Sequence, residues 1–84
     1  MSQRIEWKES AKRDLRAIEK ETAQRILIAI TRLVFLHEGD IKKLEDIEPP
    51  EWRLRVGDYR VRYRKDGDQF TILAVANRRE AYRR

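Results

Sequence analysis

Cysteine is absent from this chain of 84 residues, so neither disulfide bonds nor thiolate metal sites can stabilise its fold. No apolar run approaches the ~20 residues that a membrane-spanning helix requires, and the charged start "MSQRIEWKES" is unlike a signal peptide. We therefore expect a cytoplasmic protein with no membrane partner. A chain this short buries only a little over ~60% of the surface that its unfolded form exposes, which predicts one domain with a thin core.

Groups that usually move protons or bind metals are also scarce. The only histidine is His37, far in sequence from the basic C-terminal segment, and we interpret it as structural. The acidic residues between positions 52 and 84 are scattered and lack the spacing of a metal-ligand cluster. We therefore expect no metal and no cofactor. In that segment Lys65, Glu80 and Tyr82 are the groups that could transfer a proton.

Positive charge is present in excess, and it is concentrated at one end of the chain. Residues 1–51 carry ten Lys or Arg against eleven Asp or Glu, whereas residues 52–84 carry ten against four. Nine of those last ten cations are arginine, which keeps its charge at any working pH and matches phosphate with its planar fork. The imbalance indicates a polyanionic partner such as nucleic acid, with a solvated basic surface as the alternative.

The first half of the chain has the pattern of one strand and two helices. "RIEWKE" (4–9) alternates apolar and polar residues, as a half-buried strand does. Ser10 can cap a first helix. Residues 21–38 carry apolar side chains at the i, i+3, i+4 and i+7 positions of a second helix, and Gly39 supplies its stop.

Three apolar residues, Ile28, Phe35 and Leu36, lie outside the apolar stripe of the second helix. Burial in the core and docking of a partner chain explain them about equally well.

The second half predicts a loop followed by two hairpins. Residues 39–51 include two prolines, which exclude a helix, and we interpret this segment as a loop. Gly57-Asp58 suits a type II′ turn, and Asp66-Gly67 suits a type I′ turn before the apolar run 70–77. The predicted fold class is α+β in the order β-α-α-β-β-β, a small antiparallel sheet with two N-terminal helices packed on one face.

The stretch "WRLRVGDYRVRYRK" (52–65) alternates arginine with apolar residues on both sides of its turn. With Gly57-Asp58 as the turn, the apolar residues share one face of the hairpin and the arginines share the other. The opposed pairs on the second face are Arg53–Arg62 and Arg55–Arg60, with Arg64 just beyond. Directly opposed like charges are destabilising. Asp58 lies in the turn and the other acids are concentrated elsewhere, so we interpret this as a face that binds phosphates.

The segment "WRLRVGDYRVRYRKDGDQFTILAVANRREAYR" resembles the signature of the RelE/ParE toxin superfamily, in which a basic strand leads into "GDYRV.Y", an apolar strand, and then an arginine and a tyrosine. Length, element order and the N-terminal "I.W...A..DL" segment are similar too. The resemblance implies a single RelE-like toxin domain over residues 1–84 and a cognate RelB-like antitoxin as partner. For the RelE type it also implies binding to the ribosome (16S rRNA and A-site mRNA) and metal-free mRNA cleavage by the 2′-hydroxyl.

Carried over by position, three residues receive catalytic roles from this resemblance. Arg60 matches the arginine that stabilises the transition-state phosphate, Arg78 matches a second one, and Tyr82 matches the tyrosine that positions the substrate nucleotide. The other cations of the segment are expected to bind RNA: Arg53, Arg55, Lys65, Arg62, Arg64, Arg79 and Arg83.

The general base is left unassigned. The best-known RelE type has lysines where this chain has Arg53 and Arg55, and arginine does not readily give up its proton. Two other functions stay open: a ParE-type toxin that inhibits DNA gyrase without catalysis, and a plain RNA- or ribosome-binding module.

Overall fold

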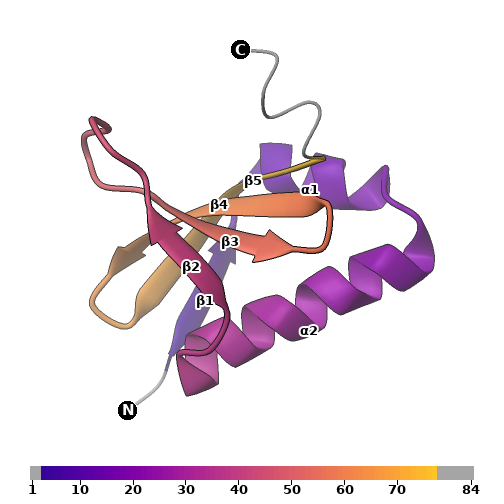
Figure 1. Cartoon of the computed structure of the whole chain (residues 1–84), viewed down its shortest axis with the longest axis horizontal. Coiled ribbons are helices and arrows are strands. Elements are labelled where there is room, and N and C mark those ends of the chain that lie inside the picture. Colours follow the sequence, from indigo (N-terminus) through magenta and orange to yellow (C-terminus); the bar gives the residue numbers. More distant parts are fainter. Residues whose placement is uncertain (1–2, 78–84) are drawn as a thin grey trace.

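The computed structural model describes residues 3–77 as two helices packed against a sheet of five strands (Figure 1). The elements are β1 (Arg4–Trp7), α1 (Glu9–Arg16), α2 (Lys20–Leu36), β2 (Asp40–Lys43), β3 (Trp52–Val56), β4 (Tyr59–Asp66) and β5 (Gln69–Asn77). The strand order is β1-β5-β4-β3-β2, and β1 pairs with β5 in parallel whereas the other pairs are antiparallel. The α+β class is confirmed, but the sheet is mixed. Neither helix in this part of the chain is long and apolar enough to cross a membrane.

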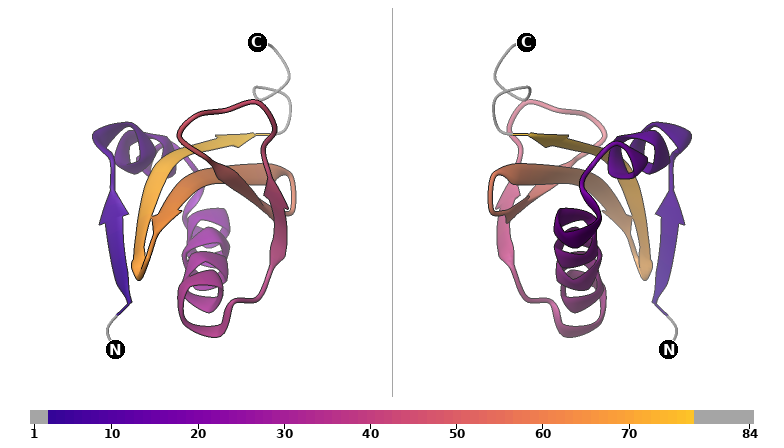
Figure 2. Two further views of the ribbon diagram at one scale, coloured as in Figure 1. Left: turned by 90° about the vertical axis from the view of Figure 1, so that its left-hand side faces the viewer. Right: turned by 90° about the vertical axis from the view of Figure 1, so that its right-hand side faces the viewer.

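The core lies between α2 and the concave face of the sheet (Figure 2). Leu54 pairs with Val61 as the alternation predicts, and Trp52 stacks on Tyr63 with 6.2 Å between ring centroids. Burial of each large side chain contributes about 1.5–3 kcal/mol. The buried residues are Ala11 of α1, Ile26, Ile30, Leu33 and Val34 of α2, and Leu54, Val61, Tyr63, Phe70, Ile72 and Val75 of the strands.

Residues 40–43 form an edge strand, β2, where the sequence predicted a loop from 39 to 51. Its four residues are all exposed, so it lacks the apolar alternation by which a strand is recognised. Backbone pairing with β3 holds it, and the Leu44 N–H then donates to the Glu51 carbonyl at 2.9 Å. The loop between β2 and β3 is thereby closed at its base.

The first helix is joined to the edge of β5 by its side chains. Ser10 does not cap α1, whose N-cap residue is Lys8; instead the Ser10 hydroxyl donates to the Leu73 carbonyl at 2.7 Å. The Asp14 carboxylate accepts the Val75 N–H at 3.0 Å. Leu73 is the extra residue of a bulge in β5, just beyond the end of β1. Helix α1 therefore satisfies backbone groups of β5 that the short β1 does not reach.

The long helix ends at Leu36, three residues before the predicted stop at Gly39. His37 adopts the left-handed conformation, with φ of 56°, and its N–H donates to the Leu33 carbonyl at 3.1 Å. The Glu38 N–H donates to the Arg32 carbonyl at 3.3 Å, a pattern that satisfies the last carbonyls of a helix. His37 is therefore a helix cap, in agreement with its structural interpretation.

Both hairpins turn at a Gly-Asp pair. Gly57-Asp58 is the predicted turn, with φ of 60° at the glycine and no positive φ at the aspartate, as type II′ requires. In the second hairpin Asp66 pairs with Gln69, so the turn is Gly67-Asp68 and not Asp66-Gly67. Gly67 also has φ of 60°, so this turn places its glycine in the first central position as well.

Candidate phosphate-binding face

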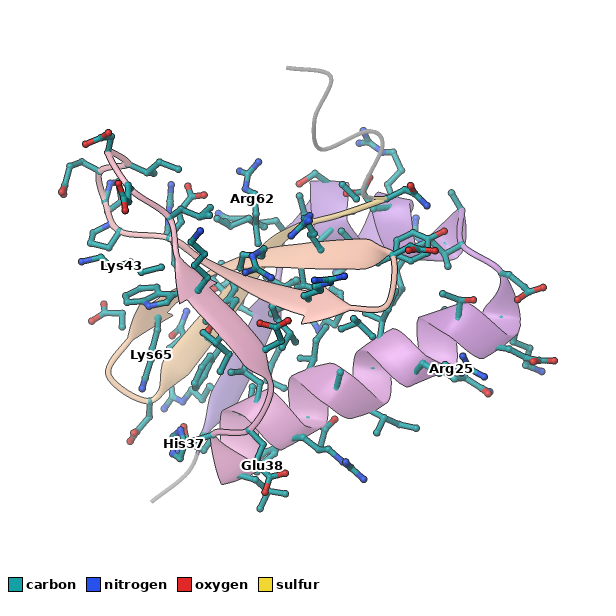
Figure 3. The ribbon with its side chains drawn as sticks, viewed as in Figure 1. Arg25, His37, Glu38, Lys43, Arg62 and Lys65 are labelled. Carbon is teal, nitrogen blue, oxygen red and sulfur yellow. The ribbon has the colours of Figure 1, made fainter. Side chains whose placement is uncertain are left out.

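The face of the sheet opposite α2 carries the arginines of β3 and β4. Arg53 pairs with Arg62 and Arg55 with Arg60, which confirms the predicted register. We call this surface, formed by Arg53, Arg55, Arg60, Arg62 and Arg64, the arginine face. Figure 3 shows the side chain of Arg62 pointing away from α2. The β5 partners of Arg60 and Arg62 are alanines, so little side-chain volume stands beside these guanidinium groups on that strand.

A buried carboxylate lies within the arginine face. Glu51 precedes β3, and its side chain is only 8% exposed. Its Oε1 accepts a hydrogen bond from Arg62 Nε at 3.2 Å, and its Oε2 lies 3.5 Å from Arg64 Nη2. A buried charge persists only when it is paired in this way. The expectation that no carboxylate neutralises the arginines is therefore wrong.

The sequence does indicate on which side of the strand Glu51 lies, through its spacing from the arginines that follow it. Residues 51, 53 and 55 are spaced two apart, and this spacing places them on one side of an extended chain. The alternation of arginine with apolar residues begins at Trp52, so that pattern alone assigns Glu51, one position earlier, to the preceding loop.

Arg53 and Arg55 have different surroundings. The Arg53 side chain is 15% exposed, and its Nη1 lies 4.0 Å from Asp40 Oδ1 of β2 without a hydrogen-bond acceptor. Arg55 is exposed, and its Nε donates to the Gly57 carbonyl at 3.5 Å, a long hydrogen bond. Buried guanidinium donors that lack an acceptor are well suited to an incoming anionic oxygen.

The structure does not bring every predicted RNA-binding residue to this face. Lys65 lies on the opposite side, with its Nζ 5.5 Å from the centroid of the Phe70 ring. Arg78, Arg79, Tyr82 and Arg83, like Glu80, lie outside the described residues. Within residues 3–77 no three His, Asp or Glu side chains gather in a way that could hold a metal ion.

The chemistry available on the arginine face is stabilisation of negative charge. Guanidinium groups bind phosphate oxygens strongly and do not accept protons. Tyr63 lies between Arg62 and Arg64 in sequence, but its side chain lies in the core. Burial there raises the pKa of Tyr63 to about 12. It therefore stays neutral at physiological pH and packs with Trp52 and Phe70 on the other side of the sheet.

A second surface lies on the outer side of α2. Ile28, Phe35 and Leu36 are each more than half exposed, which excludes core burial as their explanation. Leu27 and Ile41 are partly exposed as well. The docking of a partner is the interpretation that remains for these residues.

The matching family model and the similar solved structures both come from toxin–antitoxin systems. The family model described as the ParE toxin of the type II toxin–antitoxin system parDE matches residues 5–82. The RelE chain of an archaeal RelE–RelB complex from Pyrococcus horikoshii is similar with a TM-score of 0.74 and 27% identity, over 93% of this chain and 97% of that one.

Two further solved structures share the fold. A chain of the RelB–RelE antitoxin–toxin complex from Methanococcus jannaschii has a TM-score of 0.76 at 23% identity, over 92% of this chain and 94% of that one. A chain of a chromosomal ParDE system from P. aeruginosa has a TM-score of 0.69 at 18% identity, over 89% and 95%. No curated protein sequence matches the chain.

Proposed function

This chain belongs to the ParE toxin family of type II toxin–antitoxin systems, and on that premise we propose that it is a ribosome-dependent endoribonuclease of the RelE type. The observation that carries the proposal is the arginine face. Its directly opposed arginines repel one another, Glu51 compensates part of that repulsion through Arg62 and Arg64, and the phosphates of an RNA chain would stabilise the face further. The RelE relative at 27% identity supports the same assignment.

The proposed reaction uses the nucleophile that RNA itself carries. The 2′-hydroxyl oxygen attacks the adjacent phosphorus while the bond from phosphorus to the 5′ oxygen breaks, which leaves a 2′,3′-cyclic phosphate and a 5′-hydroxyl. Arg60 and Arg78 stabilise the charge that develops on the phosphate oxygens, and Tyr82 positions the nucleotide. Because arginine cannot accept the proton of the 2′-hydroxyl, that proton passes to a phosphate oxygen or to Tyr82, and the leaving 5′ oxygen takes up a proton to become the 5′-hydroxyl.

A RelB-like antitoxin is the proposed partner. The two archaeal RelE structures were both solved with RelB. The exposed apolar residues of α2 offer an amphipathic segment a surface, and the excess positive charge of the C-terminal part favours an acidic one.

One observation favours a second function. The matching family model and the P. aeruginosa neighbour are of the ParDE type, for which the superfamily resemblance implies inhibition of DNA gyrase without catalysis. On that reading Arg60 would hold an acidic protein surface or DNA, and mRNA would remain intact.

Primer extension on translating ribosomes separates the two functions. The purified protein should produce new mRNA 5′ ends within A-site codons, and Arg60→Ala should reduce their rate of appearance about 100-fold or more. Arg25→Ala, which removes an exposed arginine of α2, is the matched control and should cut normally. Intact mRNA together with inhibited gyrase supercoiling would establish the ParE-type function instead.

A further inference from the structure

Lys65, a predicted RNA-binding residue, lies on the core side of the sheet and not on the arginine face. Trp52 and Lys43 lie at the same end of that side. Taking RNA as the ligand from the proposed function, we propose that these three residues form a second RNA-binding site, the Trp52 site. In this site an unpaired base of the RNA stacks on the indole ring of Trp52, and the two lysines bind the phosphates on either side of that base.

Strand pairing brings the three residues of the Trp52 site together. Lys43 of β2 is paired with Trp52 of β3, which is in turn paired with Tyr63 of β4. Paired residues lie on the same face of a sheet, and so do residues two apart in one strand. Lys65, two residues after Tyr63, therefore lies on this face as well. Figure 3 shows Lys43 and Lys65 at the end of the sheet that is farther from α1.

Trp52 is the member of its aromatic cluster that solvent reaches. Tyr63 and Phe70 are 3% and 1% exposed, whereas Trp52 is only partly buried. Tyr63 stacks against one side of the indole, with 6.2 Å between the ring centroids and 21° between the ring planes. On the other side of Trp52 lies the edge strand β2, where its paired residue is Lys43. The indole therefore has an outer side on which a planar base can stack, whatever the identity of the base.

The charged side chains of the strands around Trp52 suit phosphates. Lys43 and Lys65 are both exposed. The two acidic residues of strands β2 to β4, Asp40 and Asp66, alternate onto the opposite face of the sheet. Proteins commonly bind single-stranded nucleic acids with cations beside an aromatic ring, because the ring holds the base while the cations hold the backbone.

The Trp52 site continues the arginine face around the edge of the sheet. Lys42 is paired with Arg53 and so lies on the arginine face, whereas the next residue, Lys43, points to the other side. Because β2 is the edge strand, no further strand of residues 3–77 separates the two faces at this point. An RNA strand whose phosphates lie on the arginine face therefore has a cationic path over β2 to Trp52. Lys65 then binds RNA as predicted, although apart from the arginine face.

Tryptophan fluorescence tests the stacking, because a base that stacks on an indole ring quenches its emission. The chain contains two tryptophans, Trp7 and Trp52. In Trp7→Phe protein the emission comes from Trp52, and a single-stranded RNA oligonucleotide should quench it as binding saturates. The matched control is Trp52→Phe, in which Trp7 of β1 should keep its emission with the same RNA. An abasic oligonucleotide of the same length carries the phosphates without the bases and should leave the emission of Trp52 unchanged.

The affinity for the same RNA, measured by the anisotropy of a labelled oligonucleotide, tests each side chain. Trp52→Ala should weaken binding about 5-fold or more, and Trp52→Phe, which keeps an aromatic ring, should weaken it less. Lys43→Gln and Lys65→Gln should each reduce the slope of log affinity against log salt concentration by about 0.7. Lys20→Gln should leave that slope unchanged, because it removes an exposed lysine at the end of α2 that lies away from β2 (Figure 1).

Three results would overturn the Trp52 site: RNA that does not bind, unchanged Trp52 emission at saturation, or slopes of the Lys43 and Lys65 variants equal to that of Lys20→Gln. Thermal unfolding checks each variant, and the lysine variants decide the matter if Trp52→Ala does not fold. Cleavage on ribosomes is measured separately with the wild-type protein. Quenching and the expected slopes without cleavage would keep the Trp52 site and reject the nuclease, whereas cleavage without quenching would do the reverse.

Discussion

The two faces of the β3–β4 hairpin are made by alternate residues of the same strands, yet they differ in almost every property. On one face Leu54, Val61 and Tyr63 are at most 3% exposed and contact the core. On the other, Arg55 is exposed and Arg62 is about half exposed. The comparison shows how a thin domain obtains both a core and a ligand surface from one hairpin, because a strand presents successive side chains to opposite faces.

The largest expected effect comes from a change on the apolar face. Leu54→Ala removes a side chain that is 1% exposed in the centre of β3, and should lower the free energy of unfolding by about 2–5 kcal/mol. That is a large share of the ~5–15 kcal/mol typical of a domain. Urea unfolding followed by circular dichroism measures it. A loss below about 1 kcal/mol would contradict the assignment of this face to the core.

An intermediate effect is expected from high pH. The pKa of Tyr63 is raised to about 12 in the folded protein, against 10.0 for an unburied tyrosine. The unfolded chain therefore loses this proton first, so the contribution is complete below pH 10 and declines from there towards pH 12. The decline amounts to about 2–3 kcal/mol. Urea midpoints between pH 9 and 12 measure it, and Tyr63→Phe should show a smaller decline.

The smallest effects are expected on the arginine face, and they sharpen the contrast within it. Arg55→Gln should change the free energy of unfolding by less than about 0.5 kcal/mol, with relief of the opposed Arg60 as a small gain. Arg62→Gln should cost about 1–2 kcal/mol, because buried Glu51 loses a charged donor. Paired thermal and urea unfolding would detect this difference; equal stability of the two variants would argue against Glu51 as an anchor.

The sequence predicted the hairpin better than the segments around it. The residues of β3 and β4 alternate strictly, so their faces and their register followed from the Gly57-Asp58 turn. Strand β2 has no apolar alternation and exists through backbone pairing with β3, which a single-sequence pattern does not reveal. Ser10 has the residue type of a helix cap, but a tertiary hydrogen bond to β5 uses its hydroxyl.

Glu51 was missed for a related reason. Its role depends on guanidinium groups 11 and 13 positions later in the chain, brought beside it by the fold of the hairpin. Its spacing from Arg53 indicates the side of the strand on which it lies, but only the structure shows that its carboxylate is buried. The catalytic roles of Arg60, Arg78 and Tyr82 stay predictions that the ribosome experiment addresses.

The bonds from α1 to β5 also bear on how this protein avoids self-association. A nine-residue strand beside a four-residue neighbour would expose unpaired backbone groups, which recruit strands from other molecules and lead to aggregation. Ser10 and Asp14 occupy two of those groups, at Leu73 and Val75. At the far edge, β2 carries two lysines that discourage the same contact. A toxin molecule that is released from its antitoxin would therefore keep its sheet from growing into an aggregate.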